Sequence, residues 1–329
     1  MGLPVTVYRW DDVGAPQLVN RTPSEIITIL KKCLVTGYGA KSALGWTQVF
    51  EDTFRHMIVF RNDPTLGSGS SVKLSSRNGV NAPQTMLDFR PAVSYVDIDT
   101  PYRAGYSACV HSFHSSINKW VVIGTSTAFY IILSNMDAVS GYDSRRDDTC
   151  FVGDIKSLIP MDAGKFITVN SVNTSGDDIG LSHAGWQSAF NYIWYSSMVS
   201  STSNDVLLMY DADGGNASAK YALVAPFTPQ NGSNITKLAT DKLGLYTPIY
   251  VQMTKFPIGY MALDTHGNHM VASTVSPTLR GFLPGIIIEA SPRYAFENWP
   301  VYDEINNQQH FLMRSMTTSA FTWMNCEEW

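Results

Sequence analysis

The strongest local pattern in the chain predicts an amphipathic helix over residues 22–34, in the segment TPSEIITILKKCL. Its apolar residues recur at spacings of three and four and therefore share one helix face: Ile26, Ile27, Leu30 and Leu34. Thr22 suits the N-cap, Pro23 suits the first turn, and Glu25 completes a capping box. Gly37 then ends the helix in a left-handed conformation.

Most of the remaining chain carries short strand patterns separated by Gly, Pro, Asn and Ser. Residues 46–50 and 56–61 predict a hairpin directly after the helix. Residues 119–135, KWVVIGTSTAFYIILSN, predict a second hairpin with two nearly all-apolar arms, which belong in a core or under a partner chain. Further strands are predicted at 72–74, at 95–100 and in LYTPIYVQM, IGYMALDT, GIIIEA and HFLMRSM.

These elements predict a mainly β protein with minor α content (α+β). The expected architecture is one or more compact antiparallel β domains with an N-terminal helix-loop-hairpin, and the aromatic segment 185–199 is a candidate second helix. The polar stretch 135–149 is the best candidate boundary between a helix-hairpin β region at 1–140 and a β-rich region with an aromatic tail at 150–329. Strand pairing across this stretch would instead make the chain one continuous domain.

The composition indicates a protein surface with few charged side chains. Of the 329 residues, 16% are charged and 12% are aromatic, against about 25% charged in typical soluble proteins. This fits the centre of a permanent interface as well as an ordinary β-rich protein. The net charge is −5 and the 23 basic residues are scattered, so sequence-specific nucleic-acid binding is not expected.

The chain shows no sign of secretion or membrane insertion. Its first residues lack a secretory signal, and no apolar run approaches the length of a membrane span. The four cysteines are far apart and form no C-x-x-C pair, which fits a reduced protein made in the cytoplasm.

Residues 37–42, Gly-Tyr-Gly-Ala-Lys-Ser, look like a phosphate-binding loop. Such a loop needs a strand before it and a helix after it, so that backbone N–H groups and the helix dipole converge on the phosphate. Here the helix precedes the loop and a strand follows, and Ala40 stands where the motif requires glycine. Nucleotide binding is therefore not expected.

The remaining motifs indicate no catalytic residue, no metal site and no cofactor. Two H-x-x-H pairs are present, His111/His114 and His266/His269. Their spacing of three, without a neighbouring Glu, departs from the zinc-enzyme pattern. The loop DADGGN at 211–216 lacks the full calcium-loop pattern and is better interpreted as a solvated turn. Cys109 and His111 could pair on a strand, yet a buried inert thiol is more common.

Large aromatic residues beside polar groups are the main candidates for a functional surface. Flat rings with polar tips suit protein interfaces or sugar contact, and the alternative is core packing. The interface candidates lie in the apolar hairpin and in the C-terminal tail: Trp120, Phe129, Tyr130, Trp323 and Trp329. The tail at 321–329 is expected to be an arm that docks on its own domain or on a neighbour, and its deletion is expected to leave the isolated fold soluble.

The segment at 4–52 resembles the opening of uncharacterised virion structural proteins of tailed bacteriophages and prophages. The similarity lies in DVGAP, CLVTGYG and GWTQVFED, and further phrases follow in the same order: MIVFRN, KWVVIGTSTAFYIILS, FVGDIKSLIPMDAGKFITV and LRGFLPGIII. The ending FTWMNCEEW departs from the GPW-like finish of that family, so the tail is expected to dock differently.

The resemblance implies a non-enzymatic structural component of the virion, placed in the tail, baseplate or neck and made in the bacterial host cytoplasm. The implied partners are copies of itself and other tail, neck or capsid proteins. Closed rings of such subunits would bury the hairpin faces and the aromatic tail. The alternatives are a head decoration protein, a carbohydrate-binding receptor module of the tail, and a cell-wall hydrolase.

Overall fold

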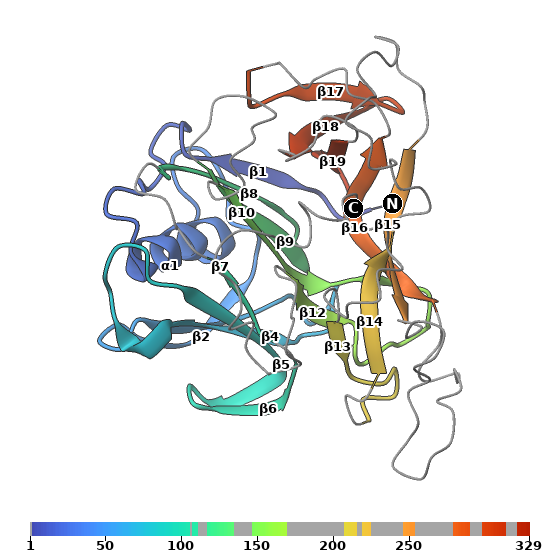
Figure 1. The fold of residues 1–329 in the computed structure, drawn as a ribbon, viewed down its shortest axis with the longest axis horizontal. Coiled ribbons are helices and arrows are strands. Elements are labelled where there is room, and N and C mark those ends of the chain that lie inside the picture. The colour runs from blue at the N-terminus through green and yellow to red at the C-terminus, as the bar shows by residue number, and fades with distance from the viewer. Residues whose placement is uncertain are drawn as a thin grey trace, which may run out of the picture.

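The computed structural model describes ten stretches of the chain. They are residues 2–105, 107–110, 117–134, 147–169, 207–215, 219–224, 246–253, 279–289, 298–313 and 321–329. This part of the protein is mostly β structure, arranged in three antiparallel sheets beside a short α-helix (Figure 1). The candidate helix at 185–199 lies outside the described residues.

Helix α1 spans Pro23–Lys31 and begins where the pattern predicts, with Thr22 as its N-cap. The Thr22 hydroxyl accepts a hydrogen bond from the Glu25 N–H at 3.4 Å. The Glu25 carboxylate accepts from the two backbone N–H groups that precede Thr22, and so fixes the entry of the chain into the helix. A π-helical turn, Lys32–Thr36, then continues the helix to Gly37, whose φ is 74°.

A six-stranded sheet follows the helix along the chain. In spatial order its strands are β2 (Thr47–Asp52), β3 (Met57–Arg61), β4 (Ser71–Ser76), β5 (Leu87–Asp97) and β6 (Thr100–Ala104), with β7 (Ala108–Val110) also paired to β5. A 3-10 turn at Arg77–Gly79 lies between β4 and β5. Arg55 in the β2–β3 turn donates to Asp99 in the β5–β6 turn at 2.9 Å, so the ends of these two hairpins meet.

A five-stranded sheet contains the apolar hairpin. Its strands, in spatial order, are β1 (Thr6–Arg9), β8 (Lys119–Gly124), β9 (Ala128–Ser134), β10 (Asp147–Asp154) and β12 (Phe166–Val169). Strand β9 ends just before the predicted boundary at 135–149, and β10 begins within its last residues. The two strands pair along their lengths, from Ser134 opposite Asp147 to Ala128 opposite Gly153. Strands from both predicted regions therefore share this sheet.

An eight-stranded sheet contains the C-terminal strands. In spatial order they are β13 (Leu207–Met209), β14 (Ala219–Val224), β15 (Tyr246–Met253), β16 (Leu279–Glu289), β19 (Phe321–Asn325), β18 (Gln308–Met313) and β17 (Tyr302–Ile305), with β11 (Lys156–Ser157) paired to β16. Strand β19 lies between β16 and β18. The first part of the predicted arm, Phe321–Asn325, is therefore an inner strand of this sheet, since its backbone pairs with a neighbouring strand on each side.

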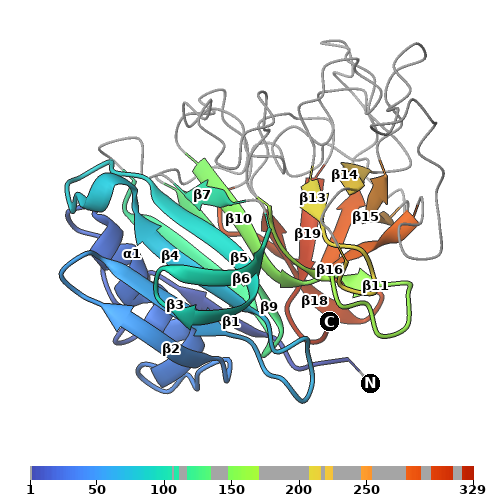
Figure 2. The same ribbon diagram turned by 90° about the horizontal axis from the view of Figure 1, so that it is seen from below.

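The five-stranded sheet is the middle layer of the molecule (Figure 2). Alternate residues of its hairpin enter two different hydrophobic cores, as expected for a strand with a period of two. Val121 and Tyr130 pack with the eight-stranded sheet. Val122 and Phe129 pack with α1 and the six-stranded sheet. All residues of β9 are buried, which explains why both arms of the hairpin are apolar throughout.

The two ends of the described chain pair with each other. The Leu3 N–H donates to the Trp329 carbonyl at 2.7 Å, and the Trp329 N–H donates to the Leu3 carbonyl at 3.0 Å. Pro4 and Glu328 form an antiparallel bridge beside these bonds. The N- and C-terminal segments consequently lie side by side (Figures 1 and 2).

Deleting residues 321–329 is expected to prevent folding, in contrast to the expectation from sequence. The deletion leaves β16 and β18 without their shared neighbour and removes the buried Trp323 and Trp329. Loss of one buried aromatic side chain typically costs about 3–5 kcal/mol, and a whole domain is stable by about 5–15 kcal/mol.

Far-UV circular dichroism and thermal unfolding would test this expectation. The control is Trp329→Phe, which keeps a ring in the core and should unfold cooperatively at a lower temperature than the wild type. A truncated chain with the wild-type transition would contradict the inner position of β19.

Candidate functional site

The five aromatic residues predicted as interface candidates all lie inside the chain. Trp120 and Phe129 belong to the core between the six- and five-stranded sheets. Tyr130, Trp323 and Trp329 belong to the core between the five- and eight-stranded sheets. Protein contact, sugar contact and core packing were all open from the sequence, and in the structure these rings pack in the core. Two other sheets of the same chain cover the hairpin that carries three of them.

Trp329 is held by contacts specific to its ring. Its indole N–H donates to the Asn325 carbonyl at 2.9 Å, and its ring packs edge-on against Tyr130 with centroids 5.4 Å apart. The Tyr130 hydroxyl in turn donates to the Pro284 carbonyl at 2.9 Å. Gly285 has a φ of 67° and lies against the indole, where a Cβ would overlap the ring. The tail thus docks on its own sheet.

The glycine-rich loop at 37–42 has a structural role. Lys41 forms an ion pair with Asp12 at 2.8 Å and donates to the Val7 carbonyl, so its ammonium group is held within the chain. Tyr38 donates to the same Asp12 carboxylate at 2.8 Å. A Cβ at Gly39 would overlap the backbone of the loop that follows β1. The glycine is therefore required for close packing of two loops.

The buried cysteine thiols have the properties of core residues. Cys33, Cys109 and Cys150 are buried and free, and burial raises the pKa of each. For Cys109 the pKa rises to about 12, so the thiolate needed for nucleophilic or metal chemistry is disfavoured.

The predicted histidine pairs lie outside the described residues. In the loop 211–215, the Asp211 backbone carbonyl accepts from the Gly214 N–H, and the Asp213 carboxylate accepts from the Gly215 N–H, as expected for a turn. Within the described stretches, no three His, Cys, Asp or Glu side chains are grouped as metal ligands would be.

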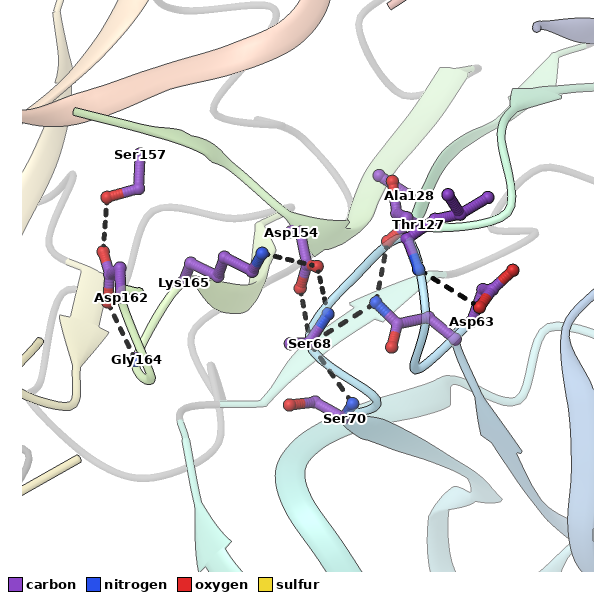
Figure 3. Close-up of polar contacts among 12 residues, drawn as sticks. Asp63, Ser68, Ser70, Thr127, Ala128, Asp154, Ser157, Asp162, Gly164 and Lys165 are labelled. Atoms are coloured by element: carbon purple, nitrogen blue, oxygen red, sulfur yellow. Dashed lines mark hydrogen bonds and ion pairs between the residues drawn. The ribbon is translucent and has the colours of Figure 1, made fainter. Parts of the chain in front are cut away.

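A buried polar junction connects the six-stranded sheet to the middle sheet (Figure 3). The Asp154 carboxylate accepts from the Ser68 N–H at 2.7 Å and from the Ser68 hydroxyl at 2.6 Å, and the Lys165 ammonium lies 3.5 Å away. The Asn62 amide donates to the Thr127 carbonyl at 3.1 Å. Burial raises the pKa of Asp154, although the Ser68 hydrogen bonds and Lys165 act in the opposite direction.

A second buried ion pair fixes the segment between β11 and β12. Arg280 donates to both carboxylate oxygens of Asp162 at 2.6 Å, and both side chains are fully buried. The Ser157 hydroxyl also donates to Asp162 at 2.6 Å, and Arg280 donates to the Tyr210 carbonyl at 2.8 Å. Such a pair is costly to form in a low-dielectric interior and strongly destabilising to break from one side. Here it determines the backbone path at the start of β16.

An aromatic and cationic cluster lies at the surface where β1 meets the β17–β18 hairpin. Trp10 stacks on Trp299 with centroids 5.5 Å apart and planes 7° apart. The Arg9 guanidinium lies 5.3 Å from the Trp10 ring and donates to the Tyr302 hydroxyl at 3.2 Å. The Lys119 ammonium lies 5.5 Å from the Trp10 ring. Cations at these distances are attracted to the ring face.

Two hollows of opposite charge flank this cluster. The basic hollow has a volume of about 450 Å³, and its lining includes Trp10, Gln17, Val19, Arg21, Asn118 and Lys119. The acidic hollow has a volume of about 470 Å³ and is lined by Tyr302, Asp303, Glu304, Asn307, Gln309 and Glu327. Since Arg9 and Trp10 adjoin one hollow and Tyr302 lines the other, the two hollows are neighbours. This pair of hollows is the candidate functional site.

The sequence pattern does not identify this site. Its residues come from four segments far apart along the chain, and none forms a motif. One local signal exists: Asn306-Asn307 between two strand patterns is typical of a two-residue hairpin turn, and their φ values are 55° and 62°.

No protein-family model matches this chain, and no curated protein matches it. In the described ranges no helix is both long and apolar enough to cross a membrane.

Replacing Gly285 with alanine is expected to destabilise the protein through Trp329. Gly285→Ala adds about 1–2 kcal/mol of backbone strain at positive φ and about 1–3 kcal/mol of overpacking against the indole. The matched control is Gly79→Ala, because Gly79 has a similar φ of 68° with no atom within 4 Å of its Cβ position. Urea denaturation of both variants measures the difference. Equal losses would contradict the packing of Trp329 on Gly285.

The Asp154 junction is expected to make stability depend on pH. Its raised pKa means that the folded state binds the proton more tightly than the unfolded state. Its contribution to stability is therefore present at acidic pH and lost as the pH rises through the folded pKa. The free energy of unfolding of the wild type, relative to Asp154→Asn, should fall with rising pH in a urea series.

Ser68→Ala provides the control for this effect. It removes a hydroxyl that stabilises the Asp154 carboxylate, so the fall should extend to higher pH. A relative stability that rises with pH would contradict the raised pKa.

Proposed function

We propose that this chain is a non-enzymatic structural component of a tailed-phage virion. It assembles with copies of itself and with neighbouring tail, baseplate or neck proteins. The resemblance of the segment at 4–52 and of the later phrases to virion structural proteins suggests the setting. The structural observation that supports a role in assembly is an exposed apolar surface whose backbone is held in a fixed conformation.

This surface, the Met161 patch, consists of Leu158, Met161 and Leu279. Their exposed fractions are 55%, 98% and 39%. The Leu158 N–H donates to the Arg280 carbonyl at 2.9 Å, which places Leu158 beside the start of β16. Adjacent exposed apolar side chains of this kind are typical of contact surfaces between proteins.

The backbone beneath the patch is fixed and locally strained. Met161 has a φ of 54°, which is unfavourable for a residue with a side chain, and the next residue is the fully buried Asp162. The strain places an apolar side chain where it makes little contact with its own chain. A residue held this way fits a role in contact with another molecule.

The buried ionisable groups support a structural rather than a catalytic role. Asp154 and Asp162 bond to groups that hold loops against sheets, and the buried thiols have raised pKa values. The five aromatic interface candidates lie inside the chain, so their rings do not support the alternative of a sugar-binding receptor.

Incorporation into particles tests the proposal. Phage particles purified from a host that expresses the chain should contain it, as measured by mass spectrometry. Leu158→Ser/Met161→Ser should reduce the incorporated amount several-fold while thermal unfolding of the isolated protein stays unchanged. Val80→Ser, at another exposed apolar position, is the control and should incorporate normally. Particles that lack the wild-type chain would contradict the proposal.

A further inference from the structure

Met161, the most exposed residue of the Met161 patch, presents its thioether side chain to solvent. Its exposed fraction is 98%, against 1% for Met209, 1% for Met313 and 0% for Met324. Among the methionine side chains that the structure describes, it is the most exposed. Because oxidants must reach the sulfur to react with it, this exposure separates Met161 chemically from the methionines of the core.

The loop that carries Met161 is anchored on both sides of this residue. Before it, the Leu158 N–H donates to the Arg280 carbonyl at 2.9 Å. After it, the Asp162 carboxylate accepts from the Gly164 N–H at 2.9 Å and from the Arg280 guanidinium at 2.6 Å. These contacts hold the backbone in the conformation that turns the Met161 side chain outward, so its exposure is a property of the fold.

We propose that Met161 is a site of oxidation to methionine sulfoxide by peroxides, and that this modification weakens the contact made by the Met161 patch. The modification site follows from the exposure and the anchored loop. Its effect on the contact rests on the proposed role of the patch in assembly. Oxidation converts a flexible apolar side chain into a polar one, so a single atom changes the character of the patch.

The oxidation needs no catalytic group of the protein. A lone pair of the Met161 sulfur attacks one oxygen of hydrogen peroxide, and the O–O bond breaks. The attacked oxygen loses its proton and becomes the sulfoxide oxygen, while the other oxygen takes up a proton and leaves as water. The sulfur is oxidised and the peroxide is reduced by the same electron pair. Access of peroxide to the sulfur therefore sets the rate.

The sulfoxide affects a contact and the isolated fold differently. On the isolated chain the new oxygen is hydrated, because the side chain is 98% exposed, so the fold loses no stabilising contact. In a contact the same oxygen must give up water, and the apolar side chains of Leu158 and Leu279 beside it offer no donor in return. Burying a polar group without a hydrogen bond is unfavourable, so the contact weakens while the fold is unchanged.

Peroxide treatment of the isolated full-length chain tests the modification site. Trypsin releases Met161 in the peptide 157–165, which contains no other methionine, so mass spectrometry follows its oxidation directly. Met161 should oxidise at least about tenfold faster than Met209, Met313 and Met324, because its sulfur is accessible and theirs are buried. Thermal unfolding should stay unchanged while Met161 alone is oxidised. A Met161 that reacts no faster than the buried methionines would overturn the proposed site.

Two matched variants test the effect on the contact. Met161→Gln imitates the sulfoxide with a polar side chain of similar length, and Met161→Leu keeps the position apolar and resists oxidation. The Gln variant should enter phage particles several-fold less than the wild type, and the Leu variant should enter normally. In purified particles, Met161 of the wild type should oxidise more slowly than in the isolated chain, because the contact covers it.

The outcomes separate this inference from the virion role. Equal incorporation of the two variants, or equal oxidation of Met161 in particles and in the isolated chain, would overturn the effect on the contact. Particles that lack the wild-type chain would overturn the virion role and the effect on the contact together. The oxidation rates of the isolated chain test the Met161 site independently of particles.

Discussion

The two-sided apolar surface of the five-stranded sheet determines the arrangement of the rest of the molecule. All of β9 is buried, and the alternate residues of β8 and β9 enter different cores. A sheet of this kind is stable only when other layers cover both faces. Each apolar side chain left exposed to water would lose the stabilisation that burial gives, about 1.5–3 kcal/mol. The six-stranded sheet with α1 covers one face, and the eight-stranded sheet covers the other (Figure 2). Because these layers come from opposite halves of the chain, the central sheet joins the two halves.

Buried polar contacts determine how the outer layers attach to this sheet. Asp154, at the end of β10, binds Ser68 in the loop between β3 and β4 of the six-stranded sheet, and Asp162 binds Arg280 of the eight-stranded sheet. Apolar packing alone would allow the layers to slide, because it is not directional. Hydrogen bonds to a buried carboxylate have defined directions and leave a costly unpaired group when they break. One carboxylate on each side of β11 therefore fixes the position of one outer sheet.

Much of the local structure follows from the sequence, whereas the identity of the partner surfaces does not. The helix at Pro23–Lys31 and the apolar hairpin have periodicity and turn residues that predict them directly. Trp120, Phe129 and Tyr130 were expected at an interface because a strand covered by its own chain and one covered by another chain have the same apolar pattern. Only the tertiary fold distinguishes these cases. The two charged hollows could not be predicted at all, since their residues are brought together by the pairing of distant strands.

The use of aromatic residues in the core limits what remains for contact with other molecules. Five large rings expected at the surface are buried, so an interface on the described surface must use other groups. A small apolar patch such as the Met161 patch contributes limited area, and exposed ion pairs are individually weak, at about 0.2–1 kcal/mol. Such an interface gains strength through repetition, because symmetry doubles each contact and a closed assembly forms all of them together. A core that already contains the large aromatic rings and a surface with few charged residues therefore favour the proposed symmetric assembly over tight binding as a single copy.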